Sequence, residues 1–131
     1  MPRPSFDSVE AYLAALPDDS RAVLGRVFAA LRKGVPGAEP VISYGIPALR
    51  AGGRVVVYCA AFTAHYSVYP ATRDLVEALG DALEPYEYNG KGTIRFPLAG
   101  KVPVALLTRI GRLRAAEDAA RGVRRLAAKK K

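Results

Sequence analysis

Residues 54–62, with the sequence RVVVYCAAF, constrain the fold more than any other segment of this chain. β-Branched and aromatic side chains favour extended backbone. Because the segment is apolar on both of its faces, it predicts a strand in the interior of a sheet. The single cysteine, Cys59, lies within this strand, where we expect a buried small side chain. A lone cysteine also excludes a disulfide within the chain.

The segments on either side predict helices around further strands. One strand is expected at 41–50 with a break at 45–47, and further strands at 65–69, 86–88 and 92–98, with turns at 51–53 and 89–90. Helices are expected from Asp7 to about Leu16, from 18 or 19 to about 33, from 73 to 83, and from Pro103 onward. This order predicts an α+β fold of two layers, with an antiparallel sheet of about five strands packed against N-terminal, middle and C-terminal helices.

Polar residues predict where three of these helices begin. Asp7, followed three residues later by Glu10, is typical of a capping box with a carboxylate at the cap. Asp18 or Asp19 is expected to cap the second helix, and Thr72 the third.

The formal net charge of +8 is concentrated at one end of the chain. Residues 1–108 contain eleven basic and ten acidic side chains, whereas residues 109–131 contain nine basic and two acidic ones. The body is therefore nearly neutral, and any electrostatic attraction of a partner belongs to the C-terminal segment. We expect residues 1–115 to form a single domain and residues 116–131 to form a basic helix end or a disordered tail.

Composition also bears on the compartment. No run of apolar residues approaches the roughly 20 that a membrane helix needs, and the N-terminus lacks the apolar core of a signal peptide. With one cysteine and no such segment, a reducing cytoplasm is the expected location.

Three separated motifs carry the most specific information. They are Ser-Tyr-Gly-Ile-Pro at 43–47, His-x-x-x-Tyr-Pro at 65–70 and Lys-Gly-Thr-Ile-Arg-Phe-Pro at 91–97. In this order, with a Gly-rich hairpin after the first, they resemble the YdhG-like family of small bacterial domains, most of which have no known function. The resemblance covers roughly residues 5–115 and implies the same two-layer α+β architecture.

The resemblance also implies a metal hypothesis, because some members of that family are described as frataxin-like intracellular iron chaperones. Clustered carboxylates are hard oxygen ligands that suit iron. Glu77, Asp81 and Glu84 follow one another at helical spacing in the helix expected at 73–83, so they would share one face. The alternative is a solvated outer face, and the chain lacks the long acidic ridge of frataxin itself.

A second hypothesis places one residue set at a common sheet edge. If the three motifs meet there, a polar pocket forms from two phenols, one imidazole and two cations: Tyr44, His65, Tyr69, Lys91 and Arg95. Such a set suits an anionic or carboxylate ligand. The alternative is structural, with glycines and prolines shaping turns and tyrosines burying their rings. His65 alone is a weak metal ligand and could equally be a hydrogen-bonded strand residue.

A third hypothesis concerns the basic C-terminal segment. Its cations would contact the phosphates of DNA or RNA without sequence preference: Arg121, Arg124, Arg125, Lys129, Lys130 and Lys131. No aromatic residue is interspersed among them to stack on bases. The alternative is a solubilising helix end whose cations complement the negative end of the helix dipole.

No arrangement in the sequence indicates catalysis. The chain offers neither the nucleophile, base and orienting residue of a hydrolase nor a Gly-rich phosphate loop. We therefore expect a cytoplasmic binding protein and no enzyme. Weak iron binding is the first candidate function, and a small anionic ligand or nucleic acid remain alternatives. No membrane partner and no resident cofactor are expected, and the oligomeric state is left open.

Overall fold

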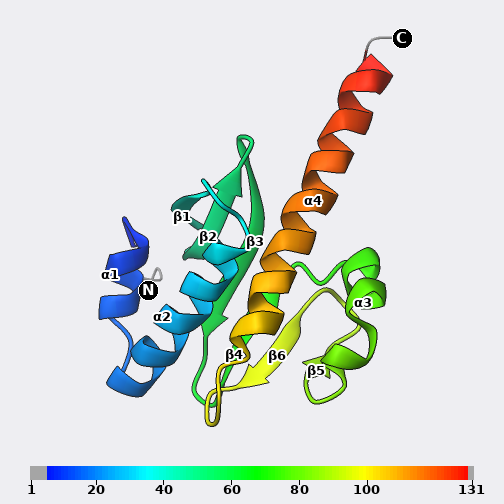
Figure 1. The fold of residues 1–131 in the computed structure, drawn as a ribbon. Helices are drawn as coiled ribbons and strands as arrows, with labels where there is room; N and C mark the ends of the chain where they lie inside the picture. Colours follow the sequence, from blue (N-terminus) through cyan, green and yellow to red (C-terminus); the bar gives the residue numbers. More distant parts are fainter. Residues whose placement is uncertain (1–5, 130–131) are drawn as a thin grey trace.

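The computed structural model describes the backbone of residues 6–129 and the side chains of residues 6–122. Its centre is a six-stranded sheet in which every neighbouring pair is antiparallel, in the order β1-β2-β3-β4-β6-β5 (Figure 1). The strands are β1 (Glu39–Ser43), β2 (Ile46–Ala51), β3 (Arg54–Ala61), β4 (His65–Tyr69), β5 (Glu87–Tyr88) and β6 (Ile94–Pro97). The α+β expectation is confirmed.

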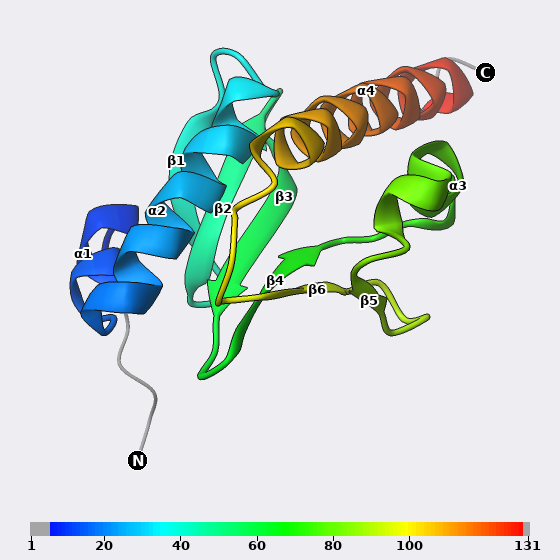
Figure 2. The same ribbon diagram turned by 60° about the horizontal axis from the view of Figure 1, so that its bottom comes forward.

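Four α-helices and one 3₁₀ helix accompany the sheet. They are α1 (Val9–Ala14), α2 (Asp18–Lys33), α3 (Arg73–Leu79), the 3₁₀ helix η1 (Gly80–Leu83) and α4 (Val104–Lys129). Helices α2 and α4 lie across one face of the sheet, as Figures 1 and 2 show. None of the helices among the described residues is long and apolar enough to span a bilayer.

Helices α2 and α4 approach each other closely, and two glycines make this possible. A Cβ added at Gly34 would lie 2.1 Å from the carbonyl oxygen of Thr108, and one at Gly111 would lie 2.4 Å from that of Leu31. The Thr108 hydroxyl donates a hydrogen bond of 3.0 Å to the carbonyl of Ala30. The two helices therefore form a rigid layer over the sheet.

Strand β3 lies in the interior of the sheet, as its composition predicts. The register pairs Cys59 with Val68 and Tyr58 with Tyr69. Because successive side chains in a strand point to opposite faces, Cys59 and Tyr58 belong to different faces of the sheet. Cys59 joins the hydrophobic core and is fully buried, and this burial raises its pKa to about 12. It is the buried small side chain expected, and it stays a thiol at neutral pH.

The sheet has six strands where about five were expected, because one turn was placed wrongly. The break expected at 45–47 is instead a two-residue hairpin turn formed by Tyr44 and Gly45, between the paired residues Ser43 and Ile46. Both turn residues have positive φ, 54° and 78°, as the favoured hairpin turns with two such residues require. Residues 39–51 are thus two full antiparallel strands.

Two of the expected helix caps are wrong and one is confirmed. The Ser8 hydroxyl, and not Asp7, accepts the N–H of Ala11 at 3.1 Å, and α1 ends at Ala14. At α2 the cap position is Pro17, so the two aspartates that follow lie in the first turn, where they complement the helix dipole. Thr72 caps α3 by accepting the N–H of Leu75 at 3.1 Å.

The helix expected over 73–83 is interrupted. Gly80 has a φ of 49°, which ends α3 after Leu79, and the chain continues as the separate 3₁₀ helix η1. Arg109 of α4 donates a hydrogen bond of 2.8 Å to the carbonyl of Ala78, which fixes this end of α3 against α4. The positive φ at Gly80 is the reason that residues 73–83 do not share one helical axis.

Helix α4 joins the body well beyond the expected domain boundary at residue 115. Arg114 is only 4% exposed, and its guanidinium donates to the carbonyl of Val56 and to Glu117, each at 2.9 Å. Glu117 also accepts hydrogen bonds from Thr72 at 2.7 Å and from Arg121 at 3.3 Å. Every charge in this group has a partner, which is what burial of charge requires.

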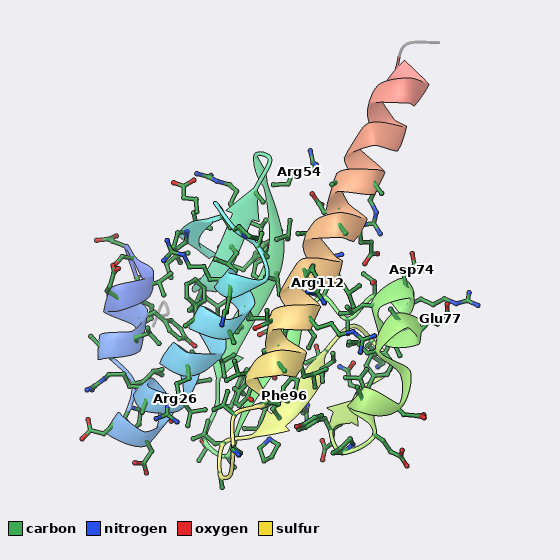
Figure 3. The ribbon with its side chains drawn as sticks, viewed as in Figure 1. Arg26, Arg54, Asp74, Glu77, Phe96 and Arg112 are labelled. Carbon is green, nitrogen blue, oxygen red and sulfur yellow. The ribbon has the colours of Figure 1, made fainter. Side chains whose placement is uncertain are left out.

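A second ion pair extends the attachment. Asp118 accepts a hydrogen bond of 2.9 Å from Arg54 at the start of β3, and Figure 3 shows Arg54 beside α4. Residues 116–121 therefore pack on the domain as part of α4.

Candidate functional site

An aromatic cavity of about 650 Å³ lies on the face of the sheet that carries Tyr58 and Tyr69. Six aromatic residues line it: Phe6, Tyr12, Tyr44, Tyr58, Phe62 and Tyr69. The rest of the lining is small or aliphatic: Gly45, Ile46, Ala60, Ala61 and Pro70. The chain has seven tyrosines, four phenylalanines and no tryptophan, so more than half of its aromatic rings surround this one cavity. No charged side chain of residues 6–122 belongs to the lining.

Adjacent strands set a row of three tyrosines across the sheet. Tyr58 and Tyr69 are direct partners on β3 and β4, and their ring centroids lie 6.1 Å apart at an interplanar angle of 43°. The ring of Tyr44, at the β1–β2 turn, lies 6.0 Å from that of Tyr58 at 41°. Rings tilted in this way are not stacked face to face. All three rings of the row line the cavity.

The N-terminal segment contributes two more rings. Phe6 packs edge-to-face against Tyr12, with ring centroids 5.3 Å apart. The Tyr12 hydroxyl accepts the backbone N–H of Ala61 at 3.3 Å, at the end of β3. A phenol that accepts one hydrogen bond still has its own proton to donate. Tyr12 can therefore offer a ligand both a ring and a hydrogen-bond donor.

Two tyrosines of the cavity, Tyr12 and Tyr69, are neutral phenols at physiological pH. Burial raises the pKa of Tyr12 above its usual value, an effect that the hydrogen bond from Ala61 partly offsets. Burial is also the main reason that the pKa of Tyr69 is raised, with smaller contributions from Tyr12 and Cys59. These two residues therefore contribute ring surface and hydroxyl groups to the site, without phenolate charge.

Tyr44 stands out for its backbone. It is the one residue other than glycine with positive φ among residues 6–129, and its side chain is 90% exposed. A bulky L residue in this region costs about 1–2 kcal/mol. Because an exposed ring recovers little of that cost through burial, the strain favours a role for Tyr44 outside folding.

The pocket expected from Tyr44, His65, Tyr69, Lys91 and Arg95 is divided in the structure. Tyr44 and Tyr69 line the aromatic cavity, whereas His65 and Arg95 line a second cavity of about 410 Å³. His65 and Tyr69 stand at opposite ends of β4, about 13 Å apart along the strand. Lys91 lines neither cavity; it lies in the loop between β5 and β6, where its N–H donates to the Asn89 side chain at 2.8 Å.

The second cavity retains a polar character. His65 stacks on Phe62 with ring centroids 4.8 Å apart and an interplanar angle of 15°. Arg95 pairs across the sheet with Glu87, which also lines this cavity. A carboxylate beside the arginine makes this a less favourable place for an anion than the sequence suggests, since like charges repel.

The three carboxylates of the metal hypothesis are not gathered. Glu77 lies in α3 and forms an ion pair of 3.2 Å with Arg73, and Figure 3 shows it on the outer side of the helix. Asp81 belongs to η1 and Glu84 follows it, so the break at Gly80 removes the shared face. Within residues 6–122, no group of three or more His, Cys, Asp or Glu side chains could hold a metal ion.

The basic residues of the nucleic-acid hypothesis are only partly described. Arg121 pairs with Glu117. The backbone of residues 123–129 is helical, so Arg124, Arg125 and Lys129 are carried on α4. Lys130 and Lys131 lie outside the described residues. Nucleic-acid binding by this segment stays a prediction.

Comparison of the whole fold with solved structures gives a clear match. The chain superimposes with a TM-score of 0.74 on a protein from the DUF1801 family, YdhG of Bacillus subtilis. The chain has the YdhG fold. The match covers 86% of this chain and 91% of the other, at 21% sequence identity. It confirms the fold that the three motifs imply by resemblance. No protein-family model matches the chain, and no curated protein matches it significantly.

Sequence reasoning identified Tyr44 and Tyr69 and missed most of the aromatic cavity. Phe6 and Tyr12 reach it from the N-terminal segment, and Tyr58 and Phe62 from β3 and the turn after it. These residues come from two segments that are far apart in sequence, and they resemble ordinary core residues. One signal was available, since Tyr58 and Tyr69 are brought opposite each other by a tight turn between two expected strands.

Proposed function

We propose that this chain is a binding protein of the YdhG-like type that holds a small molecule in its tyrosine-lined cavity and performs no catalysis. The cavity falls within the size range of small-molecule sites, and its lining is mostly apolar with a few hydroxyl groups, as such sites usually are. The lining residues include no pair of acid and base groups that could transfer a proton.

The backbone of Tyr44 carries this proposal. A tyrosine held at a φ of 54° and 90% exposed contributes little to the core, yet it lies on the rim of the one cavity where six rings meet among the described residues. Strain kept at the edge of an apolar cavity is expected where a residue serves a ligand.

The direct test is NMR with three small aromatic probes of different charge: phenol, benzyltrimethylammonium and benzoate. Binding of at least one of them should shift the backbone amide signals of Gly45, Ala60 and Phe62, which line the cavity. A variant with Tyr58→Leu should lose these shifts. The matched variant Tyr88→Leu, at a tyrosine of β5 outside the cavity lining, should keep them. The proposal fails if no probe shifts these signals.

A second function is supported by the shape of α4. Figure 1 shows the C-terminal part of this helix extending past the sheet, and that part carries Arg124 and Arg125. A projecting basic helix suits nonspecific contact with phosphates. Ending the chain after Gly122 preserves the Arg114–Glu117 group, so the fold should persist while retention on DNA at low salt is lost. Equal retention by the shortened chain contradicts this function.

Iron binding has support from the family resemblance and none from the described carboxylates. An anaerobic Fe(II) titration by calorimetry, with Mg(II) as the control, tests it. Saturable binding specific to iron supports a carrier role. If the variant with alanine at Glu77, Asp81 and Glu84 binds equally well, these three residues are not the ligands.

A further inference from the structure

We propose that the ligand of the aromatic cavity carries a methylated ammonium group, a cation of diffuse charge, and that the tyrosine rings hold it by cation–π attraction. This inference rests on the proposed binding function and names the chemical class of the ligand. It follows from which residues line the cavity and from which are absent.

The concentration of aromatic rings is the first argument. Aromatic residues make up 8% of the chain but six of the eleven residues that line the cavity. An apolar ligand of no particular charge would be served as well by the valines and leucines that fill the core. The negative face of an aromatic ring attracts a cation in addition to offering apolar contact, and aromatic cages are the usual sites for quaternary ammonium groups.

The arrangement of the rings is the second argument. Tyr44, Tyr58 and Tyr69 follow one another at 6.0 and 6.1 Å with tilts of 41° and 43°. Tilts of this size are not flat stacking, which would cover the ring faces. Phe6 and Tyr12 approach the same cavity from the N-terminal segment. A compact cation in the cavity can therefore contact more than one aromatic side chain.

Charge at the cavity is the third argument. Among residues 6–122, no Lys or Arg lines it, so nothing in this part of the lining repels a cation. No Asp or Glu of the same residues lines it either, which disfavours a strongly hydrated ammonium or metal ion that would need a carboxylate to replace its water. Methyl groups spread the charge and weaken hydration, so a methylated ammonium group can enter a site built of rings. The nearest imidazole, His65, stacks on Phe62 and lines the other cavity.

The test compares choline with 3,3-dimethylbutan-1-ol, which has the same shape but a carbon atom in place of the charged nitrogen. Calorimetry and amide shifts on the full chain should show choline binding about tenfold more tightly than the neutral alcohol. The preference should vanish in Tyr58→Leu and persist in Tyr88→Leu. Tyr44→Leu provides a second variant that folds even if Tyr58→Leu does not, because the Tyr44 side chain is largely exposed.

The outcomes separate this inference from the proposed function. Equal or tighter binding of the neutral alcohol overturns the inference that the ligand is a cation. The proposal of a small-molecule site would still stand. If neither compound shifts the cavity amides, and phenol, benzyltrimethylammonium and benzoate do not either, both proposals fall. If choline is preferred, a comparison of choline with trimethyllysine shows whether the favoured group belongs to a free small molecule or to an amino-acid side chain.

Discussion

The first two hairpin turns of the sheet have the same form and different residues. The β2–β3 turn consists of Gly52 and Gly53, with φ of 61° and 79°, and the β1–β2 turn consists of Tyr44 and Gly45, with φ of 54° and 78°. Glycine adopts positive φ at no steric cost. The β2–β3 turn thus has the glycines that its geometry favours. The β1–β2 turn has a tyrosine at a position where glycine would cost less steric strain.

The difference between the two turns distinguishes residues that suit the local backbone from a residue that is kept despite backbone strain. At Gly52–Gly53 local preference and structure agree, and this turn was expected from the sequence. At Tyr44 they conflict, and such conflicts tend to mark functional positions. The Tyr44 ring borders a cavity lined by six aromatic residues, which is where the proposed binding function needs it.

The largest effect on stability is expected when the β2–β3 turn is given a tyrosine, as the β1–β2 turn has. Gly52→Tyr places a tyrosine at a φ of 61° with no aromatic cavity to line, so the free energy of unfolding should fall by about 1–2 kcal/mol. Urea unfolding monitored by circular dichroism measures this change. A variant as stable as the parent would mean that these turns tolerate tyrosine, and the strain at Tyr44 would lose its significance.

Removing the tyrosine from the β1–β2 turn should change the stability less, and in the opposite direction. Tyr44→Asn places a residue that tolerates positive φ in the first turn. We expect the free energy of unfolding to stay unchanged or to rise by up to about 1 kcal/mol. The same urea experiment measures it. Clear destabilisation would show that the ring of Tyr44 supports the fold, and would contradict its assignment to binding.

Removing only the hydroxyl group should change little. Tyr44→Phe keeps the ring face, so choline affinity measured by calorimetry should stay within about twofold of the parent. A larger loss of choline affinity would show that the phenol hydroxyl, and not the ring, makes the main contact.

The smallest effect is expected from pH in the neutral range. Burial raises the pKa of Tyr12 and Tyr69 above the unfolded value near 10, so both stay protonated in the fold. The stability that this burial contributes is complete below pH 10 and is lost as the pH rises through the raised values. Choline affinity should therefore be level between pH 7 and 9. The unfolding free energy should begin to decline near pH 9, where the Cys59 thiol ionises in the unfolded chain but not in the fold, and should decline further above 10. A choline affinity that titrates between pH 7 and 9 would contradict neutral phenols at Tyr12 and Tyr69.

What could be predicted from sequence depended on how local the cause was. The interior position of β3, the burial of Cys59 and the Thr72 cap follow from neighbouring residues, and the structure has all three. The gathering of Tyr12 and Tyr58 around one cavity depends on strand register and on the packing of the N-terminal segment. No local pattern encodes that gathering.

Two errors have a common origin in glycine. The sequence predicts a break in the strand at 45–47, because tyrosine rarely precedes glycine in a tight hairpin turn. Gly80 was included in a continuous helix, although its positive φ ends α3 and separates Glu77 from Asp81. In both places a glycine with positive φ changes the direction of the chain, and this change affects the positions of Tyr44 and of the three carboxylates.

The most direct test of the central claim is the affinity of benzyltrimethylammonium for Tyr44→Asn, with Tyr88→Asn as the matched control. Both tyrosines are exposed, at 90% and 40%, but only Tyr44 lines the cavity. We expect Tyr44→Asn to weaken binding about fivefold without loss of stability, and Tyr88→Asn to bind like the parent. Equal affinities in both variants would contradict it, because the strained ring would then have no part in binding.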